Sequence, residues 1–346
     1  MCNINPLGDR MNYLDVLRGL SMLMVIYCHV RLFSFKLSPE STPISTFFNA
    51  VMVHMFFFIS GYLAYKKGRQ WSVTIYGKEV FNKAVMLLIP TVVFWAILVY
   101  FQLYPWGFPA GFWFTEVLFE MFFIYFTIAY LMNKCNPLAE DIVLIGLCML
   151  MFVFSFKMTS IPFSSNLCLY QLGNYFGAFL LGLLCKKYND LFVRFISNKW
   201  LLTLTIIIPL ASLFLIYGPV KLPVTGLAWE MVRLINGMTL SVAIFALFRN
   251  NADYWNRIGR LQKYAIFIGR RTLDLYMIHY FFLPTLPILG NYFSNSQNYT
   301  IEFIVVATLT MVIVGCSLAV SAFLRTSPIL ARYLFGVSSK SSTPAS

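Results

Sequence analysis

Ten long apolar stretches dominate this sequence, and each is long enough to cross a lipid bilayer as a helix. About 20 apolar residues span the hydrocarbon core, and a spanning segment must satisfy its own backbone hydrogen bonds. The stretches cover approximately residues 12–33, 45–65, 84–101, 112–132, 141–156, 170–185, 200–217, 229–248, 264–283 and 301–324. They predict an all-α polytopic membrane helix bundle of about ten transmembrane helices.

The composition leaves no room for a soluble fold. Hydrophobic residues make up 59% of the chain and charged residues 11%, against roughly 45–50% apolar and about 25% charged residues in globular proteins. This excludes cytosolic enzymes, nucleic-acid binders and disordered scaffolds. The apolar stretches leave roughly 140 residues for loops and tails, too few for a separate soluble domain. We therefore expect one integral-membrane domain over residues 1–337 and a disordered polar tail over residues 338–346.

The 26 Lys and Arg residues predict the topology, because cationic loops stay on the cytoplasmic side of a membrane. With the N-terminus inside, most of them fall on that side, including the cluster Lys66, Lys67, Arg69, Lys78 and Lys83. The outer loops then keep only Arg31, Lys36, Lys157 and Lys221. Both termini are therefore expected in the cytoplasm. The net charge of +13 reflects this bias and suits anionic lipid headgroups, so no nucleic-acid partner is expected.

Ionisable side chains inside the apolar stretches are functional candidates, because each costs a few kcal/mol to insert. They are Asp15, Arg18, His29, His54, Glu116, Glu120, Glu230, Arg233, Asp274, His279 and Glu302. The three histidines stand on different stretches without a carboxylate at a fixed offset, so no metal site is predicted. The seven cysteines form no CxxC pair and are interpreted as small hydrophobic residues.

The first stretch carries Arg18 and His29, which are 11 residues apart. Eleven steps of an α-helix return to within about 20° of the starting direction and rise by about 16 Å, so both side chains share one face. Asp15 stands three residues before Arg18, which allows an intrahelical ion pair. Mutual neutralisation of Asp15 and Arg18, and a plain interhelical hydrogen bond for His29, remain the structural alternatives to a functional role.

The ninth stretch carries a second histidine, His279, at the membrane depth of His29, with Tyr276 one turn earlier on the same side. Asp274 is placed to pair with Arg270 or Arg271. On the second stretch, His54 is either a core residue or a supporting site residue. It precedes Gly61, which permits close approach of another helix.

Glu116 and Glu120 stand one turn apart at the outer start of the fourth stretch. They are either carboxylates stabilised by the helix dipole or a polar platform for sugar hydroxyls. Glu230 and Arg233, three residues apart, are interpreted as an interfacial ion pair. Glu302, at the start of the last stretch, is interpreted as an interfacial residue.

Four motifs together resemble the acyltransferase-3 family of bacterial membrane-bound acyltransferases. The Arg18 to His29 spacing resembles the family's Arg-x10-His signature, and Phe56–Tyr62 resembles its second-helix motif. Gly111–Phe114 resembles the Trp-Phe motif that opens its fourth helix, and Gly269–His279 resembles its late Gly-x-x-Ser-x-x-x-Tyr-x-x-His motif. The likeness extends over essentially all the apolar stretches.

This resemblance implies an enzyme of the bacterial inner membrane without a metal. It would transfer an acyl group, commonly acetyl, from cytoplasmic acyl-CoA to a hydroxyl of an extracytoplasmic or lipid-linked glycan. It assigns His29 as the catalytic residue and Arg18 as its signature arginine. A donor-contacting Arg-x-x-Arg pair of the family maps onto Lys83 and Met86, so one arginine is replaced by lysine and the other is missing. In such systems a separate extracytoplasmic transferase or polysaccharide-assembly protein is the expected partner.

The mechanism expected from these assignments runs along the first helix. Lys83 and Lys78 would hold the phosphates of acyl-CoA, with Arg18 near the pore entrance. His29 would act as general base or carry the acyl group as an acyl-imidazole, and His279 or Tyr276 would orient it or stabilise the oxyanion.

Two other functions remain open. Ten helices with buried histidines also suit a secondary transporter or exporter of a polar or glycan-related solute, although the sequence has no obvious internal repeat. A third interpretation is an inactive interaction partner in a polysaccharide-assembly complex.

Overall fold

The computed structural model describes an all-helical chain. It covers residues 11–38, 40–101, 110–158, 167–217, 226–257 and 259–336, and no strand occurs in these ranges. The predicted all-α fold is therefore confirmed. The expected disordered tail, residues 338–346, lies outside the described residues, as do Lys221 and the side chain of Lys157.

Eight helices in these ranges are long and apolar enough to cross a membrane. They are α1 (Asn12–His29) continued by η1 (Val30–Ser34), α2 (Pro43–Ala64), α3 (Val73–Tyr100), α4 (Trp113–Leu131), α5 (Pro137–Met158), α8 (Lys199–Tyr217), α9 (Gly226–Asn250) and α14 (Tyr299–Leu324). A ninth span results if Thr272–Phe282 and Pro287–Ser296, which are bent by 97°, form one broken crossing. The chain is a polytopic membrane bundle, and the cytoplasmic position of its termini stays a prediction.

The sixth predicted stretch forms α6 (Leu169–Lys187), which is not among these candidate spans. It packs against α2, α4, α5 and α9. A Cβ atom on Gly182 would overlap the Phe58 carbonyl of α2, and one on Gly61 would overlap the Phe179 carbonyl of α6. The two backbones therefore meet at small residues, as predicted for Gly61. Because protein surrounds α6, this helix needs less apolar surface than one that faces lipid.

The ninth predicted stretch is divided into α11 (Arg260–Arg270), α12 (Thr272–Ile278) and the 3-10 turn η3 (His279–Phe282). The backbones of α11 and α1 are in direct contact where the two helices cross. A Cβ atom on Gly269 would overlap the Asp15 carbonyl there. Helix α12 contacts α1, α3 and α14. These contacts place the stretch that carries His29 next to the stretch that carries His279.

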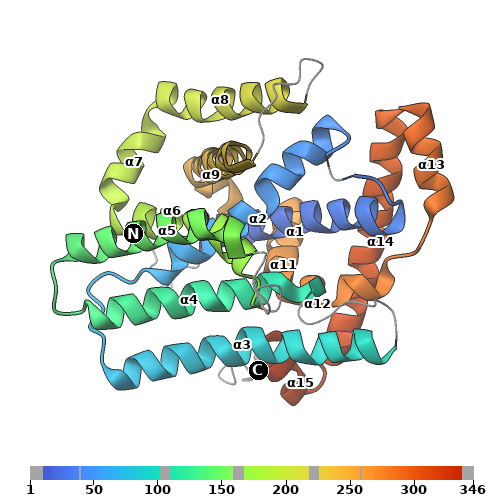
Figure 1. The fold of residues 1–346 in the computed structure, drawn as a ribbon. Helices are drawn as coiled ribbons and strands as arrows, with labels where there is room; N and C mark the ends of the chain where they lie inside the picture. Colours follow the sequence, from blue (N-terminus) through green and yellow to red (C-terminus); the bar gives the residue numbers. More distant parts are fainter. Residues whose placement is uncertain are drawn as a thin grey trace.

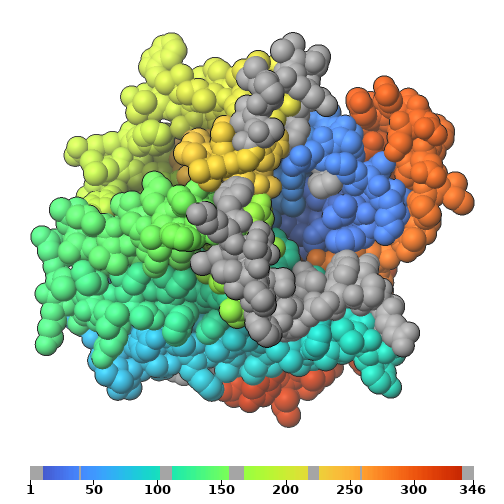
Figure 2. Space-filling model, viewed as in Figure 1, coloured from blue at the N-terminus to red at the C-terminus, as the bar shows by residue number. Residues whose placement is uncertain are grey.

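Shorter elements complete the bundle. They are η2 (Ala110–Phe112), α7 (Asn189–Ser197), α10 (Ala252–Asn256), α13 (Pro287–Ser296) and α15 (Pro328–Phe335). Helices α3 and α4 run side by side, with α15 against the outer edge of α3, and α8 lies at the opposite edge of the view (Figure 1). The space-filling view shows the orange surface of α13 beside the blue surface of α1 and α2 (Figure 2).

Sequence analysis did not predict one charged pair. Arg31 was expected in an outer loop and Glu302 at the membrane interface, and their positions relative to the membrane stay predictions. Arg31 lies in a helix and not in a loop, because the chain continues beyond His29 as the π-helix η1, and its side chain is fully buried. Its Nε lies 2.7 Å from Oε1 of Glu302 on α14. The partners are 271 residues apart, so no local spacing could indicate this pair.

Candidate active site

A cavity of about 300 Å³ lies between α1, α2, α3, α4 and α12 and is lined by both Arg18 and His29. Most of the wall between them is apolar and includes Met22, Val25 and Phe56. The structure therefore brings Arg18 and His29 to one cavity, which we call the His29 channel, as expected from their helical spacing. Their chemical roles stay predictions.

His29 and His279 meet at one end of this channel. The Nδ1 atom of His29 lies 2.8 Å from Nε2 of His279, and the two rings are stacked with centroids 5.0 Å apart. The Nδ1 atom of His279 lies 2.9 Å from the carbonyl oxygen of Leu275. His279 is fully buried, whereas His29 keeps some accessible surface and lines the cavity.

For two neutral imidazoles, these contacts are compatible with one pair of tautomers. A carbonyl oxygen only accepts hydrogen bonds, so Nδ1 of His279 carries a hydrogen and donates to Leu275. Nε2 of His279 is then an acceptor, and Nδ1 of His29 must donate to it. The remaining nitrogen of His29, Nε2, therefore holds a lone pair. A lone pair on a cavity-lining imidazole is what either a general base or a nucleophile needs.

The predicted partner Tyr276 is engaged elsewhere. Its hydroxyl donates to the Gly111 carbonyl at 3.2 Å and accepts from the Phe114 backbone N–H at 3.3 Å. Tyr276 lines the cavity, but the tyrosine ring in contact with His29 is that of Tyr280, at a centroid distance of 5.2 Å. Tyr280 also donates to the Gly111 carbonyl, at 2.8 Å. Sequence analysis missed Tyr280, although its place directly after His279 was a usable signal.

A second cavity, of about 260 Å³, adjoins the first and is rich in cations. The two share the lining residues Arg18, Ser60, Met86 and Leu118. The second cavity adds Lys66, Arg69 and Lys83, with Glu79 as its carboxylate. We call this second cavity the cationic vestibule; it meets the cavity that contains His29 at the four shared residues.

Among the predicted donor residues, Lys83 lines the vestibule and Lys78 does not. The Nζ atom of Lys83 lies 3.8 Å from the centroid of the Phe122 ring. Lys78 is exposed on α3. Lys66 and Arg69 were assigned only to the cytoplasmic charge bias, so sequence analysis missed their place in the vestibule. Arg69 is ion-paired with Glu79, the carboxylate of this cavity, at 2.5 Å.

Three other predicted residues stand apart from the His29 channel. Glu116 and Glu120 are not among the described residues that line it, and the Oε2 atom of each is buried without a hydrogen-bond partner in the described part of the chain. His54 is buried with its ring 4.9 Å from the Tyr175 ring, and Gly237 leaves the space that the imidazole fills. The acceptor-binding and supporting roles of these residues stay predictions.

The acidic residues beside the channel form ion pairs between helices. Asp15 accepts from Nε of Arg270 at 3.1 Å, while its intrahelical pair with Arg18 stays an expectation. Asp274 has the expected contact with Arg271, at 3.4 Å, but its nearer partner is Arg325, directly after α14, at 2.7 Å. Ser321 also donates to Asp274.

The predicted ion pair at the start of α9 is confirmed. Arg233 Nη2 lies 2.8 Å from Oε2 of Glu230, which stands one turn earlier on the same helix. Tyr170 of α6 donates to the other oxygen of Glu230 at 2.8 Å. The Tyr170–Glu230 hydrogen bond joins α6 to α9. The ion pair lies outside both cavities, as far as the described lining residues show.

Comparison with known proteins agrees with the architecture. A family model of the acyltransferase-3 type, described as an acyltransferase domain, matches residues 11–320, which is most of the chain. Neither the curated proteins nor the solved structures give a match.

Proposed function

The chain belongs to the acyltransferase-3 family, and from this premise we propose that it transfers an acetyl group from cytoplasmic acetyl-CoA to a hydroxyl of an extracytoplasmic or lipid-linked glycan. That it is a membrane acyltransferase follows from the family match and the spanning helices. The donor, the acceptor and the bacterial inner membrane as location belong to the proposal. The observation that carries it is that the cationic vestibule adjoins the cavity that contains His29, with Arg18 in the lining of both.

The donor would enter through the vestibule. Lys66 and Lys83 would bind the phosphates of acyl-CoA as point charges, with Arg18 at the junction of the two cavities. The apolar channel beyond Arg18 suits the pantetheine arm. The rise from Arg18 to His29 is about 16 Å, which is comparable with an extended arm. The thioester would therefore arrive beside His29.

The lone pair on Nε2 of His29 supports two routes. As general base, it takes the proton of the acceptor hydroxyl while that oxygen attacks the thioester carbonyl. The C–S bond then breaks, and the departing thiolate takes the proton from the imidazolium to leave as CoA-SH. As nucleophile, the same nitrogen attacks the thioester carbonyl, the C–S bond breaks, and CoA leaves as a thiolate from an acyl-imidazolium. The acceptor oxygen then attacks the acyl carbon, the C–N bond breaks, and the hydroxyl proton passes to the thiolate, which restores neutral His29. Both routes use the same tautomer.

His279 would act on His29 during either route. When Nε2 of His29 gains a proton or an acyl group, Nδ1–H becomes a stronger donor, and Nε2 of His279 is already in place to accept it. The Leu275 carbonyl holds His279 in the required tautomer. The arrangement is comparable in role to the third member of a catalytic triad, which orients a histidine.

The proposal is tested with inside-out vesicles, a lipid-linked glycan acceptor and acetyl-CoA labelled in the acetyl group. We expect label on the glycan with the wild-type chain and none with His29→Ala, which should still insert in the membrane. Label transfer by His29→Ala would remove His29 from the mechanism. Movement of an unmodified solute without labelled glycan would instead favour the transporter.

A further inference from the structure

The helix that carries His29 changes its form directly after that residue. Helix α1 ends at His29, and the chain continues as the π-helix η1 (Val30–Ser34). A π-helical turn is rare and is frequently found at functional sites. Contacts from other segments hold this turn.

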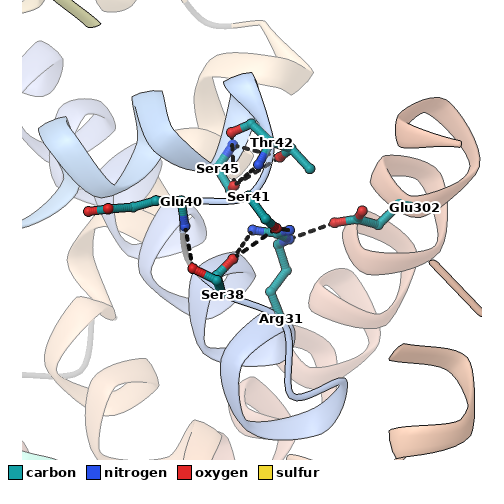
Figure 3. A network of polar contacts seen from close by, with 7 residues as sticks. All are labelled: Arg31, Ser38, Glu40, Ser41, Thr42, Ser45 and Glu302. Atoms are coloured by element: carbon teal, nitrogen blue, oxygen red, sulfur yellow. Dashed lines mark hydrogen bonds and ion pairs between the residues drawn. The ribbon is translucent and has the colours of Figure 1, made fainter. Parts of the chain in front are cut away.

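The guanidinium of Arg31 supplies those contacts. Besides the 2.7 Å ion pair between Nε and Glu302, Nη1 donates to the Ser38 carbonyl at 2.9 Å and Nη2 to the Ser41 hydroxyl at 2.7 Å (Figure 3). All three guanidinium nitrogens are thus engaged. One side chain two residues beyond His29 joins η1 to α14 and to the segment that leads into α2.

Stability alone does not explain this arrangement. Taking both charges out of water costs several kcal/mol, and a well-packed apolar pair often stabilises a fold at least as well as a buried ion pair. Directionality is what the planar guanidinium adds, because its hydrogen bonds fix an orientation that apolar contacts leave free. These hydrogen bonds therefore restrict the orientation of η1 more than apolar packing alone would.

A second tie joins η1 to the segment that follows His279. The backbone N–H of Leu286, just beyond η3, donates to the Ser34 carbonyl of η1 at 2.7 Å. A Cβ atom on Gly290 of α13 would overlap the Phe35 carbonyl, so the two backbones are in direct contact there. The segment that follows His29 is thus hydrogen-bonded to, and packed against, the segment that follows His279.

We propose that the Arg31–Glu302 ion pair is a positioning device for the His29–His279 hydrogen bond. It holds the π-turn after His29 so that Nδ1 stays within hydrogen-bond distance of Nε2 of His279. Arg31 is not among the described residues that line the channel, so it acts through His29 and not on the substrate. This inference rests on the proposed function for its catalytic consequence, whereas its structural content is independent of any activity.

The first measurement needs no substrate. The chain has three histidines, so histidine-selective 15N NMR in detergent micelles reports on His29, His279 and His54 separately. In the wild type we expect one tautomer for each of the paired imidazoles. Glu302→Gln keeps the size and one acceptor oxygen but removes the charge. It should shift the His29 and His279 signals toward a mixture of tautomers and leave His54 unchanged.

The second measurement separates positioning from folding. The double variant Arg31→Met/Glu302→Leu replaces the ion pair by apolar side chains and should unfold at no lower temperature than the wild type. We expect kcat to fall by roughly tenfold to a hundredfold in this variant and in Glu302→Gln, with KM for the donor unchanged, because a misplaced reacting group costs rate and not binding. Arg31→Lys should recover part of kcat relative to Arg31→Met.

Three outcomes would overturn the positioning role. They are unchanged His29 and His279 signals in Glu302→Gln, equal changes in all three histidine signals, and normal kcat in the apolar double variant. A wild-type chain without acyl transfer would refute the proposed function instead, while the NMR comparison would still decide whether the ion pair holds the two histidines together.

Discussion

At the scale of single residues, the decisive feature is a line of hydrogen bonds from the Leu275 carbonyl through His279 to His29. Neither histidine needs a charge for this arrangement, because each accepts or donates at one defined nitrogen. That the two histidines share one membrane depth was predicted from helical rise. Their direct contact was not, because it depends on how α1 and α12 pack.

The first prediction concerns His279. His279→Leu removes the acceptor for Nδ1–H of His29, and kcat should fall by about 10²-fold while KM for the donor stays the same. His279→Gln keeps a side-chain carbonyl acceptor and should lose less. Steady-state kinetics with labelled acetyl-CoA measure both. A loss expressed in KM for the donor would place His279 in donor binding instead.

The second prediction concerns the cationic vestibule. Lys83→Gln removes a charge from its wall, so KM for acyl-CoA should rise by about tenfold with little change in kcat. Lys83→Arg should retain the affinity. Lys199→Gln is the matched control, because this lysine is exposed at the start of α8 and outside the described lining of both cavities. An equal donor KM in Lys83→Gln and wild type would remove Lys83 from the site.

At the scale of elements, glycines set how closely α1 approaches its neighbours. The crossing of α1 and α11 places backbone against backbone at Gly269 and Asp15, which brings Arg18 to the junction of the two cavities. The Gly269 motif position was recognised in the sequence. Its physical reason, the missing space for a Cβ atom, is visible only in the packed pair of helices.

The third prediction compares two glycine substitutions. Gly269→Ala forces α1 and α11 apart, because the obstructing atoms belong to the Asp15 backbone, and it should cost about 1–3 kcal/mol of unfolding free energy. Gly146→Ala on α5 makes the same chemical change where no atom lies within 4 Å of the new Cβ, and it should be nearly neutral. Unfolding of both variants in detergent provides the comparison. Equal stabilities would show that the crossing adapts to a methyl group.

At the scale of the whole molecule, the helices enclose two adjoining cavities that differ in chemistry. Cations gather at the vestibule around Lys66 and Lys83, whereas imidazoles and tyrosines gather around His29. The bias of Lys and Arg toward one side of the membrane predicts that the vestibule opens to the cytoplasm. A donor made in the cytoplasm would then meet its phosphate contacts before its thioester reaches His29.

The fourth prediction tests this orientation. Lys67→Cys and Ser296→Cys, each in a chain without other cysteines, place exposed thiols in the α2–α3 connection and at the end of α13. In intact cells, a membrane-impermeant maleimide should label only the Ser296→Cys chain, and permeabilised cells should show both. Labelling of Lys67→Cys in intact cells would reverse the topology and place the donor entrance outside.

The sequence by itself determined the membrane solvent, the helical class and the family, because apolar length and the spacing of Arg18 and His29 are local properties of the chain. It also located the Glu230–Arg233 pair, whose partners are one helical turn apart. Only the tertiary structure decided the contacts that join distant segments. These include His29 with His279, Arg31 with Glu302 and Asp274 with Arg325. A side chain in the bilayer interior must find its polar partner across helices, and which helix lies opposite depends on the packing of the whole bundle.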